Sequence, residues 1–476
     1  MTLEATVINR NLAEAIQSRC GENAMLCYQC KKCSAGCPVS RYMDLAPNQV
    51  MRAIQFGRED QVLNCQTIWL CASCETCFTR CPQGIDIPRI MDAAKNLARE
   101  RGIKPRIPDV AIFYDLALDW INRIGRVYEL GLMGEFNMRT RQPVRNADLG
   151  IKMFRAGKIK ILPSIAMSRG KVPKRQVPRR TEAKRVAYYP GCSLHSTASE
   201  YDASTRAVAR KLGLELVEPK GWVCCGTGAA HTKSKELATV LPMRSLAMVD
   251  ANGDTKLTLP CAACFSRFRT AIHDVQHDPA MKQAVLDKVG YEYDGQIEVQ
   301  NLIDTFTKVV GLDEIGRQVT KPLAGLKVVC YYGCLLTRPP EVTGAEQPDY
   351  PMTMDRLLRR LGATVLDWSY KTECCGASLM LTQTDVALDL TRRIIQNAVD
   401  VGADTIAVAC PICHANLDSR QYQVAQKFGK VYDMPVFYFT QLMGIAMEID
   451  PKRLELQKHF VDPKPLLRRK GLTAAQ

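Results

Sequence analysis

The chain has 476 residues, of which 46% are hydrophobic and 24% charged, and its formal net charge is +15 at pH 7. This composition excludes an intrinsically disordered chain, and the length is sufficient for two or three domains that each bury a core. The 21 cysteines are gathered in tight clusters that include two adjacent Cys-Cys pairs. An odd, clustered set of this size favours metal-bound thiolates over a disulfide framework.

The N-terminal sequence MTLEATVINRNLAEAI lacks the basic region, the apolar region and the small-residue cleavage site of an export signal. We therefore expect a cytoplasmic protein. The longest apolar stretches are 110–121, which contains Asp115 and Asp119, and 436–447, which has only twelve residues. A helix needs roughly 20 apolar residues to cross a bilayer, so we expect no transmembrane segment.

Residues 1–138 are predicted to form a mostly helical domain, because apolar residues recur there at helical spacing. The clearest example lies between Pro82 and Gly102, at Ile87, Ile90, Met91, Ala94, Leu97 and Ala98.

This domain contains the spacing C-x2-C-x2-C-x3-C-P twice, in 27–38 (CYQCKKCSAGCP) and 71–82 (CASCETCFTRCP). Three cysteines at this spacing bind one cubane [4Fe-4S] cluster, and the fourth reaches the neighbouring cluster in two-cluster ferredoxins. Tetrahedral zinc also takes four thiolates, but two copies of the full run favour the ferredoxin pattern. The expected ligand sets are Cys27, Cys30 and Cys33 with Cys81, and Cys71, Cys74 and Cys77 with Cys37. Cys20 and Cys65 are expected to be buried apolar side chains.

Most of the net positive charge lies between Arg139 and Arg185, where 15 Lys or Arg residues accompany two acidic ones. The stretch is rich in proline and loses its apolar periodicity toward its end, which predicts a basic interdomain linker over 139–185. A docking strip for an acidic partner or for anionic lipid headgroups is the alternative, because a dense positive field attracts such partners. The lack of interleaved aromatic residues disfavours nucleic acid.

After the linker, short β-type runs deliver cysteines and are followed by helical segments such as Tyr201 to Leu212, which predicts α/β units with parallel sheets. The runs are RVAYYPGC (185–192), TKLTLPCAAC (255–264), LKVVCYYGC (326–334) and DTIAVACPIC (404–413). The landmarks repeat at offsets of 142, 150 and 149 residues, which pair Cys192, Cys224 and Cys261 with Cys334, Cys374 and Cys410.

This repetition indicates an internal duplication. We expect two similar α/β lobes, 186–320 and 321–450, related by an approximate two-fold axis, and a C-terminal tail over 451–476. Ligands usually bind at the carboxyl ends of parallel strands, so the loops that follow the strands of the two lobes are expected to face one another.

Each lobe supplies five cysteines, one more than a cubane cluster or a zinc tetrahedron requires. A surplus ligand beside an adjacent Cys-Cys pair indicates a cluster that is not a simple cube, or one with a replaceable ligand. The two sets are Cys192, Cys224, Cys225, Cys261 and Cys264, then Cys334, Cys374, Cys375, Cys410 and Cys413. Cys330 has no counterpart in the first lobe and is expected to be structural.

The duplicated five-cysteine pattern resembles the CCG domains of the B subunit of heterodisulfide reductase, as do the stretches YYGCLLTRPPEV, KTECCGAS, CPICHANLD and PVFYFTQLMG. Residues 1–138 resemble the C subunit of the same family, so the chain resembles a fusion of the two subunits. The resemblance implies that each five-cysteine set holds a noncubane [4Fe-4S] cluster, with a disulfide bound between them. It further implies an oxidoreductase that passes electrons through two cubane clusters to the two noncubane clusters, which cleave that disulfide.

Cleaving a disulfide consumes two electrons, whereas an iron–sulfur cluster usually passes one at a time, so two facing clusters suit the reaction. His195 and His414 are candidate proton donors and His231 a weaker one, while hydrogen bonding to cluster sulfur or backbone is the structural alternative. Gly226-x-Gly228 alone does not make a dinucleotide-binding motif. The expected electron donor is a flavoprotein that resembles the A subunit, or a membrane cytochrome.

The same ferredoxin spacing and CCG domains also occur together in iron–sulfur subunits of flavin-dependent glycolate, lactate and glycerol 3-phosphate dehydrogenases. In that alternative the chain would only relay electrons. The two five-cysteine sets favour an active site instead. A redox sensor or scaffold, a further alternative, would not call for four clusters.

Overall fold

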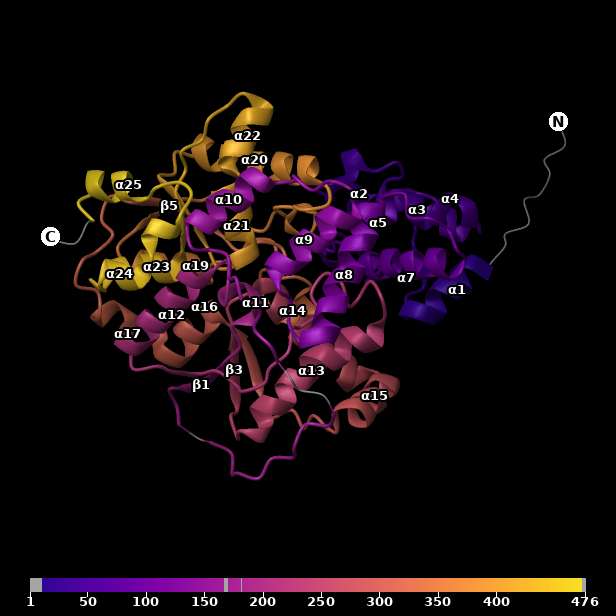
Figure 1. Cartoon of the computed structure of the whole chain (residues 1–476), viewed down its shortest axis with the longest axis horizontal. Coiled ribbons are helices and arrows are strands. Elements are labelled where there is room, and N and C mark those ends of the chain that lie inside the picture. The colour runs from indigo at the N-terminus through magenta and orange to yellow at the C-terminus, as the bar shows by residue number, and fades with distance from the viewer. Residues whose placement is uncertain (1–10, 167–169, 181, 473–476) are drawn as a thin grey trace.

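The computed structural model describes residues 11–166, 170–180 and 182–472, which form a helical N-terminal domain and two α/β lobes (Figure 1). In this view the helical domain lies at one end of the molecule, in indigo and purple. Lobe one, in pink, lies below lobe two, in orange and yellow. The predicted order of a mostly helical domain followed by two α/β lobes is therefore present.

Helix α7 (Ile87–Glu100) shows how the sequence determines the N-terminal domain. Its apolar side chains form one buried face, and Asp86 caps its first turn by accepting a hydrogen bond from the Arg89 backbone N–H at 2.9 Å. Gly102, with φ of +70°, turns the chain just beyond its end. The other helices of this part are α1 (Asn11–Cys20), α2 (Lys32–Ala35), α3 (Pro47–Gln55), α4 (Glu59–Leu63), α5 (Thr67–Leu70), α6 (Thr76–Thr79), α8 (Pro108–Ile124) and α9 (Glu129–Arg139).

Both lobes contain a four-stranded sheet in which all strand pairs are parallel. The strand order is β2-β1-β3-β4 in lobe one and β6-β5-β7-β8 in lobe two, so the same topology occurs twice. The strands are β1 (Arg185–Tyr188), β2 (Glu215–Val217), β3 (Lys256–Leu259), β4 (Glu298–Asn301), β5 (Lys327–Tyr331), β6 (Thr364–Val365), β7 (Thr405–Val408) and β8 (Val436–Tyr438). Strands β1, β3, β5 and β7 are the four runs predicted from the sequence.

Helices cover these sheets. In lobe one they are α11 (Gly191–Leu194), α12 (Ser199–Lys211), α13 (Lys235–Ala251), α14 (Ala262–His277) and α15 (Pro279–Val289), and the chain then crosses through α16 (Leu302–Asp304), a π-helix (Thr305–Gly311) and α17 (Leu312–Arg317). In lobe two they are α18 (Pro340–Thr343), α19 (Thr353–Arg360), α20 (Thr384–Asp400), α21 (Pro411–Ser419), α22 (Gln421–Phe428) and α23 (Phe439–Ala446).

The two lobes share one continuous hydrophobic core. At its centre Tyr201 of α12 stacks on Tyr438 of β8, with ring centroids 4.1 Å apart, and the hydroxyls of Ser204 and Thr440 lie 2.8 Å apart. A stacked aromatic pair contributes about 0.5–1.5 kcal/mol beyond the area it buries. The lobes are therefore packed as one body rather than as two tethered domains.

The basic stretch 139–185 has two different halves. The first contains helix α10 (Ala147–Arg155), and residues 170–180 of the second lie along the surface of lobe one as an extended strap. Val172 N–H donates to the Val289 carbonyl and Arg180 N–H to the Gly253 carbonyl, both at 2.8 Å, while Arg179 pairs with Asp250 at 3.2 Å. The strap therefore adheres to lobe one instead of crossing open solvent.

The segment 451–472, expected as part of a C-terminal tail, packs on lobe two. It forms α24 (Pro451–Leu454) and α25 (Lys464–Arg469), and its leucines, including Leu466 and Leu467, are buried in the shared core. None of the helices in the described parts of the chain has the length and apolar character needed to cross a membrane.

Candidate metal centres

The two C-x2-C-x2-C-x3-C motifs form loops with the same backbone turns. Gln29 and Lys31 have φ of 64° and 65°, and the equivalent Ser73 and Glu75 have φ of 48° and 58°. These residues flank the second cysteine of each motif in the left-handed region, which residues other than glycine rarely adopt. The short helices α2 and α6 then carry the third cysteine of each motif, and the thiols of each loop converge.

The loops gather two sets of four thiols. Cys37 lies near Cys74 and Cys71 of the second motif, and Cys81 lies near Tyr28, the residue after Cys27 of the first motif. Burial, together with the nearby Cys74 and Cys71, raises the pKa of the Cys37 thiol. We name the groups the outer set (Cys27, Cys30, Cys33 and Cys81) and the inner set (Cys71, Cys74, Cys77 and Cys37). The outer set reaches solvent at Cys30, whereas Cys74 of the inner set is buried.

The five cysteines predicted for lobe one lie together at the ends of its strands. Their thiols make a continuous series of contacts in the order Cys192, Cys224, Cys225, Cys264 and Cys261. In this series the Cys225 and Cys264 sulfurs are 3.3 Å apart. All of these cysteines except Cys192 are buried, so water does not compete with the contacts between their thiols. We call these residues the lobe-one set.

The five cysteines predicted for lobe two also lie together at the ends of its strands, and we call them the lobe-two set. Cys334 contacts Cys374, Cys413 contacts Cys410, and the sulfurs of Cys375 and Cys413 are 3.8 Å apart. Cys410 directly precedes helix α21, just as Cys261 directly precedes α14 in lobe one. The repeated sequence landmarks therefore deliver equivalent thiols to equivalent places.

Two buried tyrosines, absent from the sequence-based predictions, lie among these sets. Tyr189 and Tyr331 each stand three residues before the first cysteine of their lobe, and four thiols of the same set lie near each tyrosine. The Tyr189 hydroxyl donates to the Val223 carbonyl at 2.7 Å, and the Tyr331 hydroxyl to the Glu373 carbonyl at 2.6 Å. Each tyrosine thus holds the loop that carries the Cys-Cys pair of its lobe. Their equal distance from the first cysteine of each lobe is the sequence feature from which they could have been predicted.

The glycine that precedes the first cysteine of each lobe is required by close packing. Gly191 and Gly333 have φ of +71° and +72°. A Cβ at these positions would lie 3.4 Å from the Cys264 sulfur and 3.0 Å from the Cys413 sulfur, respectively. Side chains here would strain the turn and press on the thiol set.

The sets also contact one another across the domains. The Cys261 thiol of lobe one lies next to the Cys410 thiol of lobe two. The Cys374 thiol of lobe two lies next to the Cys74 thiol of the inner set, and this neighbour lowers the pKa of Cys74. Three of the four sets are therefore connected, in the order inner, lobe two, lobe one.

Arg338 stabilises the junction between the inner set and lobe two. Its side chain is buried, and it donates to the Thr76 hydroxyl at 2.8 Å and to the Thr372 carbonyl at 2.9 Å. Thr76 follows Cys74 by two residues, and Thr372 precedes Cys374 by two. One guanidinium thus connects the two loops whose cysteines meet.

The three candidate histidines have different surroundings. His195 lies 3.0 Å from Glu218, whose pKa falls to about 2 despite burial because His195 and Trp222 donate hydrogen bonds to it. His414 is fully buried and bonds the Val436 carbonyl at 2.9 Å, as the structural alternative expected.

His231 reaches across to the N-terminal domain, where its Nδ1 lies 2.6 Å from Asp92. It therefore connects lobe one to α7, and its backbone segment follows the Cys224-Cys225 loop. Of the three histidines, only His195 is partly open to solvent beside a thiol set, since it lines a small cavity with Cys192.

The remaining cysteines lie apart from the four sets. Cys20 and Cys65 are buried in the core of the N-terminal domain and donate to the carbonyls of Ile16 and Val62. Cys330 lies on β5, fully buried.

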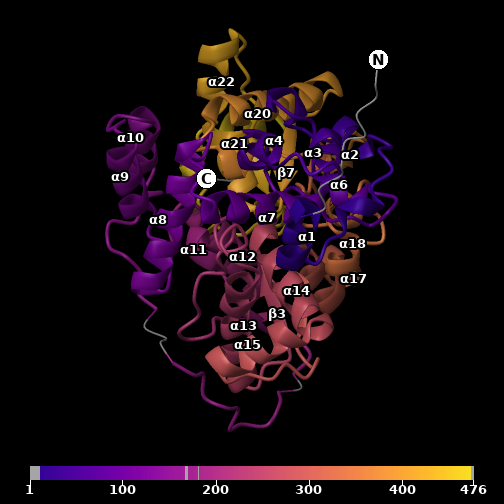
Figure 2. The ribbon, with the colours of Figure 1, turned by 90° about the vertical axis from the view of Figure 1, so that its right-hand side faces the viewer.

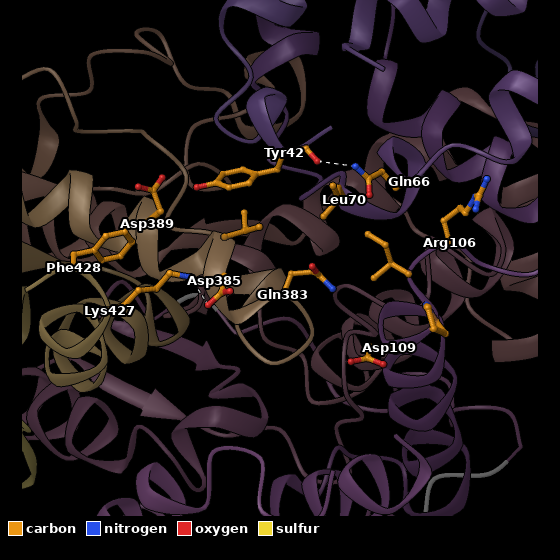
Figure 3. A pocket seen from close by; sticks show the side chains of 13 residues that line it. Tyr42, Gln66, Leu70, Arg106, Asp109, Gln383, Asp385, Asp389, Lys427 and Phe428 are labelled. Carbon is orange, nitrogen blue, oxygen red and sulfur yellow. Dashed lines mark hydrogen bonds and ion pairs between the residues drawn. The ribbon is translucent and has the colours of Figure 1, made fainter. Parts of the chain in front are cut away.

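A cavity of about 700 Å³ lies between the N-terminal domain and lobe two (Figure 3). Tyr42, Gln66 and Arg106 line it from one side, and Gln383 and Lys427 from the other. No cysteine is among its lining residues, so this cavity is separate from the thiol sets.

Comparison with known proteins agrees with this picture. A family model described as a cysteine-rich domain matches residues 186–269 and 328–418, and a model described as a 4Fe-4S dicluster domain matches residues 26–86. The chain is 32% identical to the 8-methylmenaquinol:fumarate reductase membrane anchor subunit of Wolinella succinogenes over 287 residues. This matched region covers 60% of the present chain and 99% of the relative.

Two further relatives match different parts of the chain. The B subunit of the ferredoxin/F(420)H(2)-dependent CoB-CoM heterodisulfide reductase of Methanosarcina acetivorans is 28% identical over 283 residues, 58% of this chain and 94% of the relative. The iron-sulfur C subunit of the CoB–CoM heterodisulfide reductase of Methanopyrus kandleri is 40% identical over 76 residues, 16% of this chain and 40% of the relative.

The dicluster domain and the duplicated cysteine-rich domains define an iron–sulfur oxidoreductase, and the gathered thiols are the ligand type that such clusters require. The chain belongs to the heterodisulfide reductase-like family, with a C-subunit-like domain fused to a B-subunit-like pair of CCG domains. The resemblance inferred from the sequence is confirmed.

Proposed function

We propose that this chain cleaves a disulfide reductively, with electrons delivered through four iron–sulfur clusters. The outer and inner sets hold one cubane [4Fe-4S] cluster each, and the lobe-one and lobe-two sets hold one noncubane [4Fe-4S] cluster each. The number and closeness of the thiols support this assignment, as does the similarity to the B and C subunits of heterodisulfide reductases. The bound clusters supply one-electron transfer, which protein side chains do not supply.

The contacts between the sets support an order for electron transfer. The outer set is open to solvent at Cys30 and so faces the electron donor. The inner set contacts lobe two through Cys74 and Cys374, and lobe two contacts lobe one through Cys410 and Cys261. Electrons therefore arrive at lobe two before lobe one.

The observation that carries the proposal is the contact of Cys261 with Cys410. These residues follow the equivalent strands β3 and β7, so the lobes meet through matching elements, as an approximate two-fold arrangement requires. Two five-cysteine sets that meet at one point flank a single small substrate. A chain that only relays electrons has no need of two equivalent five-cysteine sets on either side of one small substrate.

The reaction balances as one disulfide, two electrons and two protons giving two thiols. One electron comes from the side of each lobe, and each sulfur of the disulfide takes one proton. His195 is the better-placed proton donor, because it is 24% exposed and hydrogen-bonded to Glu218 next to Cys192, whereas His414 is enclosed.

The electron donor in this proposal is a flavoprotein that resembles the A subunit of heterodisulfide reductase, since the relatives are subunits of such reductases. A membrane cytochrome is the alternative donor. Either partner would approach the outer set, where Tyr28 is 59% exposed next to Cys27 and Cys30.

The test supplies oxygen-free chain with reduced viologen and a panel of low-molecular-weight and protein disulfides. The chain is expected to oxidise two viologen molecules for each disulfide converted to two thiols. The variants Cys225→Ser and Cys375→Ser are expected to lose this activity. Cys330→Ser, a buried cysteine outside the sets, is the matched control and keeps it.

An absence of viologen oxidation with every disulfide, in a preparation that holds about sixteen iron atoms per chain, would show that the proposal is wrong. A preparation with all cysteines intact but only about eight iron atoms per chain would show that the two noncubane clusters are absent.

A second candidate function is electron relay to or from a quinone. It is favoured by the relative named as an 8-methylmenaquinol:fumarate reductase membrane anchor subunit. The relatives described here do not favour the hydroxy-acid or glycerol 3-phosphate dehydrogenase alternative. Reduction of a quinone by the viologen-reduced chain, with no disulfide turnover, would identify the relay.

A further inference from the structure

Exposed apolar side chains are concentrated in one short stretch. Among the described residues, 18 large hydrophobic side chains are exposed, and eight of these lie between residues 130 and 165. They are Leu130, Met138, Val144, Ile151, Phe154, Ile161, Leu162 and Ile165. Isolated exposed apolar residues are ordinary, but a concentration of this kind marks an interaction surface.

Helix α9 holds the parts of this stretch together. At its C-terminal end the Asn137 side chain donates to the Arg145 carbonyl at 3.1 Å. Just before its N-terminal end the Tyr128 hydroxyl donates to the Ile161 carbonyl. The segment before α10 and the segment after it therefore both lie along α9, and Figure 2 shows α9 and α10 together at one edge of the molecule.

Helix α10 presents an apolar stripe to solvent. Ala147, Ile151 and Phe154 are exposed at helical spacing, while Leu149 is the buried residue that holds the helix against the protein. The neighbouring Tyr422 of α22 is 53% exposed, and the Lys152 ammonium lies 3.7 Å from the centre of its ring. An aromatic ring and a lysine beside an apolar stripe are typical of a membrane interface.

The charge around this stripe is positive. Five basic residues of the stretch are exposed, and the same stretch contains only two acidic residues, Glu135 and Asp148. The basic residues are Arg139, Arg141, Lys152, Arg155 and Lys160. Anionic lipid headgroups attract such charges, and the acyl boundary takes up the apolar side chains between them.

We propose that α9, α10 and the segment to Ile165 form a surface that docks on anionic lipid membranes from one side. A purely acidic protein partner would account for the charge, but it would leave the eight exposed apolar side chains without a contact. The proposal concerns peripheral contact, and it does not depend on the disulfide reaction.

The geometry of docking has a consequence for the thiol sets. Tyr128, Lys160 and Leu162 line the small cavity that also contains Cys192 and His195. A membrane bound to this surface would therefore lie next to the opening of the lobe-one set.

The test mixes the oxygen-free, iron-loaded chain with vesicles of phosphatidylglycerol and phosphatidylcholine, and separately with vesicles of phosphatidylcholine alone. Flotation with the vesicles is measured at low and high salt. The chain is expected to float with the phosphatidylglycerol vesicles, and added salt is expected to weaken this binding because it screens the basic residues. The double variant Ile151→Ser with Phe154→Ser is expected to bind at least about tenfold more weakly.

The matched control is Val399→Ser with Val431→Ser, which removes two exposed apolar side chains of lobe two, away from the proposed surface. This control is expected to keep full binding. An unchanged iron content and visible spectrum confirm that each variant is folded. The proposal is overturned if the unmodified chain stays free of phosphatidylglycerol vesicles, or if it binds both vesicle types equally. It is also overturned if the variant in α10 floats as well as the unmodified chain.

Discussion

A cysteine can be a metal ligand or an ordinary core side chain, and its neighbours decide which. Cys30 is exposed and lies in a loop with three other thiols close by. Cys20, in the same domain, is surrounded by apolar side chains, and burial raises the pKa of its thiol to about 11. The two residues therefore form a matched pair for substitution.

The change Cys30→Ser is expected to lower the iron content by about four of about sixteen atoms per chain, because one cubane loses a ligand. The change Cys20→Ser is expected to leave the iron content unchanged. Iron is determined per chain on protein prepared without oxygen. Equal iron contents in the two variants would contradict the ligand assignment of the outer set.

At the scale of elements, the loop-to-loop bridge made by Arg338 positions the inner set against lobe two. The change Arg338→Gln is expected to slow electron transfer from the inner set to lobe two and to cost about 3 kcal/mol of stability, since a buried charge-assisted contact is lost. Freeze-quench spectroscopy of the successive clusters after mixing with viologen measures the transfer step.

The control for this prediction is Arg317→Gln, an arginine 69% exposed whose ion pair with Glu314 lies within α17. It is expected to transfer electrons at the normal rate. A normal rate in Arg338→Gln with full iron content would show that the bridge has no part in electron transfer.

The elements also differ in how far they depend on metal. The lobes share a core of aliphatic and aromatic side chains, whereas the loops 27–37 and 71–81 are short turns around thiols. Removal of iron is expected to increase backbone hydrogen exchange in these loops and in the two Cys-Cys loops, while β1, β3, β5 and β7 remain protected. An equal increase of exchange in the sheets would contradict the prediction that only the cysteine loops depend on the metal.

Many of the helices and strands were predictable from the sequence. The four runs that became β1, β3, β5 and β7 alternate with helical patterns, and α7 has both its apolar face and its terminal signals in the sequence. Tyr189 and Tyr331 were missed because an aromatic residue at the end of a β-type run is ordinary strand composition. The packing of Leu466 and Leu467 into the core was missed because it depends on a surface formed by other elements.

At the scale of the whole molecule, parts that are far apart in the sequence meet through specific side chains. Cys74 meets Cys374, Cys261 meets Cys410, and Arg89 pairs with Asp274 at 3.1 Å. The spacing of each motif predicted which thiols gather within a domain. The duplication predicted that the two lobes face one another through these loops. The contact of the inner set with lobe two was not predicted, because it depends on how the folded domains pack.

The central claim is that the chain alone converts a disulfide to thiols at the meeting point of its lobes. The most direct measurement reduces the chain, removes the reductant, adds one disulfide and counts the free thiols released per chain. The account predicts two new thiols for every two electrons that the chain loses, and none from a chain with Cys225→Ser and Cys375→Ser. A reduced chain that keeps its electrons in the presence of every disulfide tried, yet passes them to a quinone, would contradict it.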